Sequence, residues 1–114
     1  MSSKNKIKGT AFETAVVNYI NNNSCLNVER RALSGMNDKG DIIGVPDTAI
    51  ECKNVKDWSQ RLGSFINEAE EEAANASVNI GVVVIKKRNA PIDDAYVVQS
   101  LRQWVETIER DLNG

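Results

Sequence analysis

Histidine is absent from this chain of 114 residues. That absence excludes histidine-dependent catalytic triads, the histidine-metal nuclease motifs, the zinc peptidases and every mechanism with a histidine general base. Any chemistry performed by the chain must therefore rely on Asp, Glu and Lys side chains.

Cysteine and long apolar runs are also scarce. Cys25 and Cys52 are isolated and lack CxxC spacing, so neither a disulfide framework nor a zinc site is indicated, and Cys52 is expected in the core. No segment approaches the roughly 18 apolar residues of a membrane span, and residues 1–8 are polar and basic with no apolar segment behind them, unlike a signal peptide. We expect a cytoplasmic protein with no membrane segment.

The composition suits one domain. With 41% hydrophobic and 26% charged residues, a chain of this length can bury roughly two thirds of its unfolded surface in a single core. We expect one domain over residues 1–114, with a mobile basic arm at residues 1–8. The net charge of −2 argues against an indiscriminate nucleic-acid binder, because such proteins neutralise phosphates with an excess of basic residues.

Hydrophobic periodicity predicts an α/β fold with the element order α-β-β-β-α-β-β-α. Helices are expected from about residue 9 to a polar stop at residues 21–24, from residue 58 to residue 76, and over residues 100–112. Strands are expected over residues 26–33, on both sides of a turn within residues 40–53, and over residues 79–85 and 95–98. The continuous apolar run at residues 79–85 is typical of a central parallel strand reached by a right-handed crossover.

Two of these helices carry more detailed predictions. The long helix is expected to turn its alanines toward the sheet and its acidic run toward water; that run comprises Glu68, Glu70, Glu71 and Glu72. The last helix is expected to begin with a capping box of Ser100 and Gln103. Its inward residues are predicted to be Leu101, Trp104, Val105 and Ile108.

Residues 40–53 contain two acids and a lysine in a predicted hairpin. Alternate side chains of a strand share a face, so Glu51 and Lys53 point the same way while Cys52 points the other way. If Asp41 joins them, two carboxylates offer hard oxygen ligands to a magnesium-type ion, and the lysine can stabilise charge or help to deprotonate a water. The alternative is an ordinary hairpin with charged residues at its solvent end.

The register of the hairpin decides between these alternatives. A two-residue loop at Pro46-Asp47 places Asp41 opposite Cys52, on the wrong face. The site needs an odd offset, which a three-residue loop extending to Thr48 or a single β-bulge provides. The three-residue loop puts Asp41 opposite Lys53.

Glu13 has two interpretations. Thr10 and Glu13 have the spacing of a capping box, in which the two side chains satisfy free backbone N–H groups at a helix start. Alternatively, Glu13 leans from the first helix toward a site at the edge of the sheet. The basic run Lys86, Lys87 and Arg88 likewise reads either as a solubilising strand end or as a patch that contacts phosphates.

Several short motifs together resemble those of a known family. The patterns are Lys8-Gly9-x-x-Phe12-Glu13, Arg30-Arg31-x-x-Ser34-Gly35, Gly40-Asp41-Ile42-Ile43 and Ile50-Glu51-Cys52-Lys53. They resemble the PD-(D/E)XK nuclease superfamily, which has the restriction-endonuclease-like fold, and are most similar to its archaeal-type Holliday junction resolvases, including phage members. The resemblance covers residues 8–53; beyond it only the order of elements agrees. Gly40 stands where the family name has proline.

The resemblance implies a function and a set of site residues. It implies a homodimeric endonuclease that hydrolyses phosphodiesters of branched DNA and leaves a 5′-phosphate, in a prokaryotic or phage-infected cell. Asp41, Glu51 and the backbone carbonyl of Cys52 would bind Mg²⁺ or Mn²⁺, Glu13 would complete the metal shell directly or through water, and Lys53 would orient or activate the attacking water. The residues expected to contact DNA are Lys8, Arg30, Arg31, Ser34 and Lys39.

Alternatives from other classes remain at this stage. The first is a nuclease of the same fold that acts on duplex, flapped or single-stranded DNA. The second is a DNA-binding module that has lost activity and binds no metal. The third is a protein-interaction module that uses its acidic helix as the contact surface.

Overall fold

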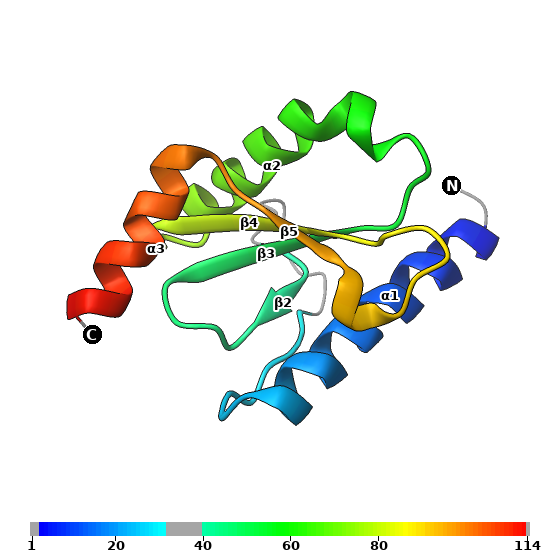
Figure 1. The fold of residues 1–114 in the computed structure, drawn as a ribbon, viewed down its shortest axis with the longest axis horizontal. Helices are drawn as coiled ribbons and strands as arrows, with labels where there is room; N and C mark the ends of the chain where they lie inside the picture. The colour runs from blue at the N-terminus through cyan, green and yellow to red at the C-terminus, as the bar shows by residue number, and fades with distance from the viewer. Residues whose placement is uncertain (1–2, 32–39, 114) are drawn as a thin grey trace.

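A computed structural model describes residues 3–31 and 40–113 of the chain, with side chains from Lys8 onward. These residues form an α/β domain in which helices flank a five-stranded mixed sheet (Figure 1). The helices are α1 (Ser3–Asn23), α2 (Leu62–Asn75) and α3 (Leu101–Asn113), with short 3-10 turns η1 (Trp58–Arg61) and η2 (Ile92–Asp94). The strands are β1 (Glu29–Arg30), β2 (Ile42–Ile43), β3 (Thr48–Lys53), β4 (Ile80–Ile85) and β5 (Tyr96–Val98). The predicted element order α-β-β-β-α-β-β-α is confirmed.

The strands lie in the order β1-β2-β3-β4-β5. The β3–β4 pair is parallel and its six residue pairs run from Thr48 opposite Ile80 to Lys53 opposite Ile85; the other three strand pairs are antiparallel. The apolar strand β4 is therefore central and parallel to β3, as predicted. Helix α2 makes the crossover between these two strands, so the carboxyl ends of β3 and β4 meet at one edge of the sheet.

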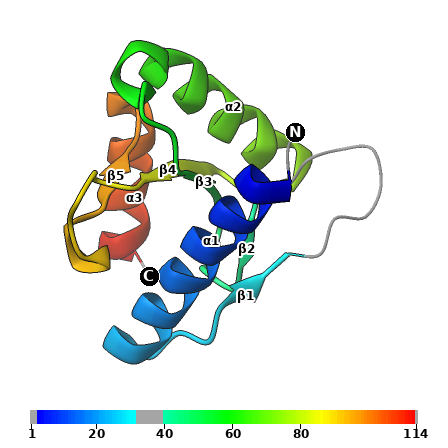
Figure 2. The same cartoon turned by 90° about the vertical axis from the view of Figure 1, so that its right-hand side faces the viewer.

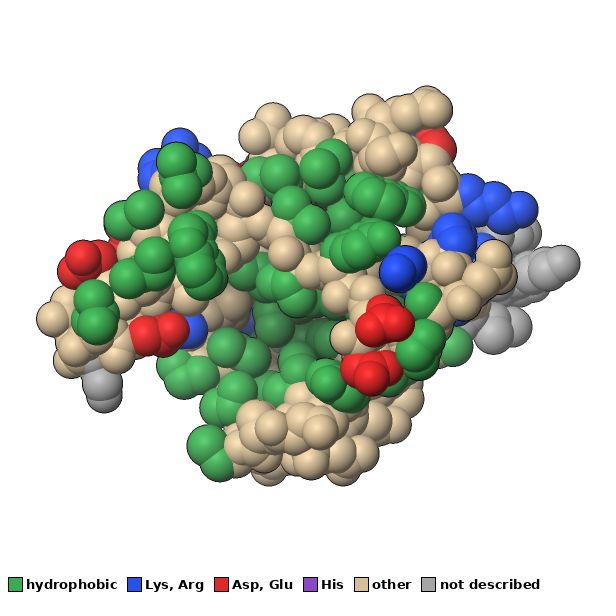
Figure 3. All heavy atoms as spheres, in the orientation of Figure 1, with side chains coloured by type: hydrophobic (Ala, Val, Ile, Leu, Met, Phe, Trp, Pro, Cys, Tyr) green, Lys and Arg blue, Asp and Glu red, His purple; other side chains and the backbone are tan. Residues whose placement is uncertain are grey.

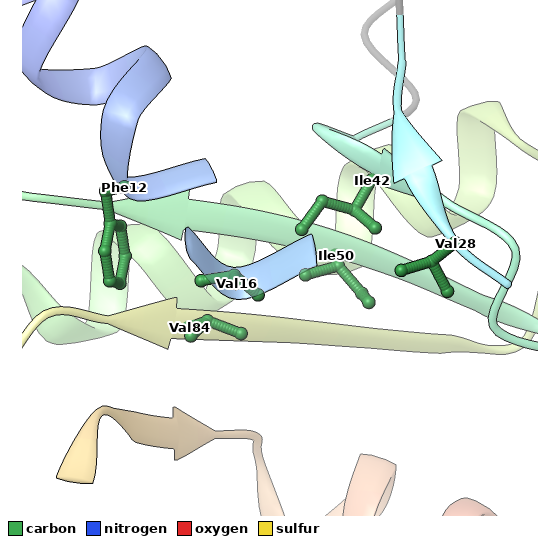
Figure 4. Close-up of a cluster of buried hydrophobic side chains, with 6 residues drawn as sticks. All are labelled: Phe12, Val16, Val28, Ile42, Ile50 and Val84. Carbon is green, nitrogen blue, oxygen red and sulfur yellow. The ribbon is translucent and has the colours of Figure 1, made fainter. Parts of the chain in front are cut away.

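Helices α1 and α2 cover opposite faces of the sheet (Figure 2). Beneath α1, a buried apolar cluster joins the helix to β2, β3 and β4; it comprises Phe12, Val16, Val28, Ile42, Ile50 and Val84 (Figure 4). Beneath α2, a second cluster comprises Phe65, Ala69, Val83 and Ile85. The alternation of side chains along β3 thus sends Ile50 toward α1 and leaves its neighbour Glu51 on the α2 side.

Helix α2 packs very closely on β4. Ala69 and Ala73 are buried, and a Cβ atom at Gly81 would overlap the backbone carbonyl of Ala69. The expectation that alanines mark a close helix–sheet contact is therefore confirmed. At the same glycine, the backbone N–H donates to the Oε1 atom of buried Gln103 on α3, which replaces a ladder hydrogen bond beyond the end of β5.

Helix α1 begins earlier than predicted. It extends from Ser3, so residues 3–8 belong to the helix and the prediction of a separate arm over residues 1–8 is corrected there. Thr10 and Glu13 consequently lie well inside the helix, and the capping-box interpretation of this pair is wrong. The reason is physical: the backbone N–H groups of interior turns already donate to carbonyls four residues earlier and need no side-chain acceptor.

Helix α3 presents its apolar stripe to the surface rather than inward. Four of its apolar side chains are between 37% and 76% exposed, which contradicts the prediction for Leu101, Trp104, Val105 and Ile108. The helix is held instead by polar contacts: Gln103 reaches β4, and Nη1 of Arg110 donates to the carbonyl of Pro46 and to Oγ1 of Thr48. The apolar side chains of α3 and the adjacent sheet form a broad exposed apolar surface (Figure 3). Among the described helices, none is both long and apolar enough to cross a membrane.

Candidate metal centre

The β2–β3 hairpin brings Asp41 and Glu51 together. Ile42 faces Ile50 across the hairpin, and the N–H of Asp41 also donates to the Ile50 carbonyl at 2.7 Å. Two consecutive residues therefore lie against one, which is the arrangement of a β-bulge. The odd offset that the site needs is already present in the pairing of Ile42 with Ile50, which brings Asp41 toward Glu51. The predicted loop over residues 46–48, which pairs Asp41 with Lys53, is wrong because Thr48 already belongs to β3.

Asp41 is fixed by backbone contacts on both sides. Its carbonyl accepts from the N–H of Arg31 at 2.8 Å, and its Oδ2 atom accepts from the N–H of Cys52 at 2.8 Å. The preceding Gly40 has a φ of +98° and lies against the Ile50 backbone, where a Cβ would be only 3.0 Å from the carbonyl oxygen. Proline cannot adopt a positive φ, so this backbone geometry excludes proline at position 40.

Lys53 lies on the same face as Glu51 and has several partners there. Its Nζ atom is 3.5 Å from Oε1 of Glu51, and 2.9 and 3.2 Å from the two carboxylate oxygens of Glu68 on α2. It also lies 4.9 Å from the ring centroid of Phe65. The ammonium group is thus held at a defined position between the hairpin and α2.

Two further acids reach this site from α2, and the sequence interpretation missed them. Carboxylate oxygens of Glu51, Glu68 and Glu72 lie within 4.8 Å of one another, and Glu72 is only 2% exposed. The prediction that the acidic run faces water is therefore wrong for Glu72 and holds only in part for Glu68, whereas Glu71 is exposed. The missed signal was spacing: Glu68 and Glu72 are four residues apart, and Glu72 falls on the stripe of Phe65 and Ala69.

Burial makes ionisation of the two hairpin acids unfavourable. Loss of solvent and then the charge of Glu51 raise the pKa of Asp41 to about 8, although the Cys52 N–H opposes the shift. Loss of solvent and the adjacent Glu72 raise the pKa of Glu51 to about 9. Burial alone would lower the pKa of Lys53, but its contacts with Glu68 and Glu51 outweigh that and raise it. Lys53 therefore stays cationic at neutral pH.

Glu13 joins the site from α1. Its Oε1 atom accepts from Nε of Arg30 at 3.1 Å, and its negative charge contributes to the raised pKa of Asp41. Glu13 is 20% exposed and the Arg30 guanidinium 43% exposed, so this pair sits at the rim of the buried acids. Glu13 does not cap its helix, and its role as a site residue stays a prediction.

The remaining predicted residues lie in three places. Lys8 is exposed on α1, near the carboxyl end of β3, where its carbonyl accepts from Asn54 at 3.4 Å. The backbone N–H of Arg31 donates to the Asp41 carbonyl, and the Nε atom of its side chain is buried. Ser34 and Lys39 lie outside the described residues. The proposed ligand role of the Cys52 carbonyl stays a prediction, since the structure shows only its N–H on Asp41.

The donor set fits a divalent cation. Glu51, Glu68 and Glu72 bring three carboxylates together, Lys53 is paired with two of them, and Asp41 adjoins this group through Glu51. Carboxylates are hard oxygen donors of the kind that Mg²⁺ and Mn²⁺ prefer. Within the described part of the chain, Oε2 of Glu51 is buried and accepts no hydrogen bond. A bound cation would offset the repulsion that raises the pKa values of Asp41 and Glu51.

Protein-family models, curated proteins and solved structures were all searched, and no match to the chain was found in any of the three.

Proposed function

We propose that the protein is a metal-dependent endodeoxyribonuclease with a restriction-endonuclease-like fold, acting on branched DNA of the four-way junction type. One observation carries the proposal: the bulged hairpin sets Asp41, Glu51 and Lys53 on one face, with Glu13 beside them. This is the constellation that the resemblance to PD-(D/E)XK nucleases requires. The mixed five-stranded sheet, with α1 and α2 on opposite faces, supports the same proposal.

The site residues have distinct proposed tasks. Asp41, Glu51 and the Cys52 carbonyl would hold Mg²⁺ or Mn²⁺, with Glu13 completing the shell directly or through water. When bound, such an ion lowers the pKa of a coordinated water and offsets charge on the phosphoryl oxygens during hydrolysis. Glu72, at contact distance from Glu51, orients that carboxylate from the side of the core.

Lys53 acts as a fixed positive charge rather than as a proton acceptor. Its contacts with Glu68 and Glu51 keep it protonated, so it can donate a hydrogen bond to the attacking water or to a phosphate oxygen but cannot take a proton at neutral pH. Of the roles expected from the sequence, Lys53 would therefore orient the attacking water and stabilise charge, and it would not deprotonate that water.

Arg30 is the best placed of the predicted DNA contacts. Its ion pair with Glu13 leaves much of the guanidinium exposed at the rim of the carboxylate site. A guanidinium in this position can donate two hydrogen bonds to one phosphate. Arg30 would therefore bind the substrate backbone beside the scissile phosphate while it holds Glu13 in place.

The proposed active form is a homodimer. Nicking opposing strands of a four-way junction requires two sites related by a two-fold axis, and one small domain carries a single site. The apolar stripe of α3 supplies a surface for a second copy, because large exposed apolar patches on a folded domain mark contact sites. Trp104 lies near the middle of this stripe and would anchor the contact.

The test is cleavage of a labelled four-way junction and of a matched linear duplex, with Mg²⁺, with Mn²⁺ or with a chelator. We expect metal-dependent cleavage of the junction, lost in Asp41→Ala and in Glu51→Ala and retained in Glu71→Ala, whose carboxylate is exposed on the same helix that carries Glu72. Equal cleavage of the duplex would show that the protein cleaves DNA without a preference for junctions. Cleavage that survives in either site variant would refute the assignment.

A further inference from the structure

A pocket lies at the carboxyl end of the two parallel strands, on the α1 face of the sheet. Its volume is about 280 Å³, just below the range of roughly 300 to 1,000 Å³ that is usual for small-molecule sites. Its wall is formed by the first half of α1, by Asn54 after β3, and by the segment that follows β4 (Figure 1). In α/β proteins, ligands bind preferentially outside the carboxyl ends of parallel strands, which is where this pocket opens.

Three lysines give the pocket a strong positive rim. Lys8, Lys86 and Lys87 line it, and no carboxylate is among its lining residues. Within the described residues, none of the three forms an ion pair. Arg88, in contrast, is used internally, because it donates to the side chain of Asn54 and to the Lys86 carbonyl. The lysine ammonium groups are therefore available to an anion, while Arg88 braces the wall.

The interior of the pocket is apolar. Phe12 and Ala15 of α1 line it together with Ile92 and Ala95 from the segment around η2. Phe12 belongs to the apolar cluster beneath α1, and Ile92 and Ala95 pack against that cluster. An apolar floor beneath three cations suits a ligand with a phosphate at one end and a flat ring or sugar at the other. Inorganic phosphate alone would leave the floor uncovered.

The pocket adjoins the candidate metal centre along the chain. Asn54 directly follows Lys53, and Phe12 directly precedes Glu13, so each wall of the pocket is one residue from a site residue. Because neighbouring residues of a strand point to opposite faces, the pocket lies on the α1 side of β3, whereas Glu51 and the two α2 acids Glu68 and Glu72 lie on the α2 side. A DNA strand that passes the end of β3 can therefore reach both places.

We infer that this pocket binds one nucleotide unit, with its phosphate on Lys8, Lys86 and Lys87 and its sugar or base against the apolar floor. The assignment of this nucleotide to a DNA substrate strand rests on the proposed function. The fit of a phosphate and a sugar or base to the pocket does not depend on it. The same chemistry would serve a free nucleoside monophosphate, so the experiment separates the two sources.

The experiment measures binding to the Asp41→Asn protein in a chelator, where cleavage is blocked. Calorimetry measures the binding of thymidine 5′-monophosphate and of thymidine. Fluorescence anisotropy measures the binding of a labelled ten-nucleotide single strand. We expect the single strand to bind and the double variant Lys86→Gln/Lys87→Gln to weaken it by about tenfold or more, since two charge-assisted contacts are lost. Ala11→Leu, which places a larger side chain at the pocket wall, should weaken it without removing any charge. Lys56→Gln removes an exposed lysine that does not line the pocket; it is the matched control and should change nothing.

The outcomes are distinguishable. If the lysine variant loses affinity for the single strand and Ala11→Leu does not, the lysines contact the DNA backbone without use of the pocket, and the inference is overturned. An equal loss of affinity in Lys56→Gln would overturn it as well. Binding of the monophosphate but not of the strand would assign the pocket to a free nucleotide. Thymidine should bind much more weakly than its monophosphate, and equal binding would also overturn the inference. Normal pocket binding by a wild-type protein that cleaves no DNA would refute the proposed function alone. Thermal unfolding of each variant verifies that it folds.

Discussion

Replacing Glu51 by glutamine should stabilise the metal-free protein at alkaline pH. The Glu51 side chain is 8% exposed, and its carboxyl group has a pKa of about 9 in the folded protein against 4.5 for an ordinary Glu. Below about pH 4.5 the group is protonated in both states and costs nothing. Above that pH the unfolded chain releases a proton that the folded protein retains, so the free energy of unfolding falls as the pH rises toward 9.

The expected magnitude follows from proton linkage. One retained proton lowers the free energy of unfolding by ~1.4 kcal/mol per pH unit between the two pKa values. Because Glu51 shares its environment with Asp41 and Glu72, part of this cost is carried by those neighbours, and ~1–3 kcal/mol is expected at pH 8 relative to pH 6. The glutamine side chain carries no such proton and can donate to the nearby carboxylates. Lys53 keeps its closer partner Glu68 in the variant.

The assay is denaturant unfolding of the wild type, Glu51→Gln and the control Glu71→Gln in a chelator, at pH 6 and pH 8. Glu51→Gln should be the more stable protein at pH 8, with a smaller difference at pH 6, and Glu71→Gln should follow the wild type because its carboxylate is exposed. Added Mg²⁺ should raise the stability of the wild type and not that of Glu51→Gln, since a ligand that binds only the folded state stabilises it by mass action. A Glu51→Gln protein that is less stable than the wild type at pH 8 in the chelator would refute the reasoning.

Three further predictions concern other parts of the fold. Gly81→Ala should lower the free energy of unfolding by ~1–3 kcal/mol or prevent folding, because its Cβ would overlap the Ala69 carbonyl; thermal unfolding tests this, and an unchanged melting temperature would contradict the close α2–β4 contact. Trp104→Asp should shift the protein from dimer to monomer in sedimentation while its circular dichroism stays the same, whereas a wild type that sediments as a monomer would contradict the proposed use of α3. Glu68→Gln should lower kcat for junction cleavage more than it changes KM, because Lys53 loses the partner that positions it, and Glu71→Gln should leave both constants unchanged.

The sequence was sufficient for the hairpin because strand alternation is a strong constraint. The i and i+2 relation of Glu51 and Lys53, together with the need to bring Asp41 to the same face, left only an odd offset, and the pairing of Ile42 with Ile50 has one. The parallel pairing of β4 also followed from a continuous apolar run behind a helix. In these cases one local pattern permits one arrangement.

The sequence was insufficient where two faces of a helix compete. A run of glutamates on α2 predicts a solvated face, although Glu72 falls within the apolar stripe and is buried against Glu51. The apolar stripe of α3 predicts a core-facing helix, although that helix is held to the domain through Gln103 and Arg110. Periodicity locates an amphipathic stripe but does not tell whether the stripe meets the domain's own sheet, a partner or buried acids.

The positive φ of Gly40 limits how this chain can vary. A residue with a side chain at this position would have to strain its backbone and press against the Ile50 carbonyl, and proline would be excluded by its ring. A substitution at residue 40 alone therefore strains the segment that leads into Asp41. The position of this carboxylate thus depends on the glycine that precedes it.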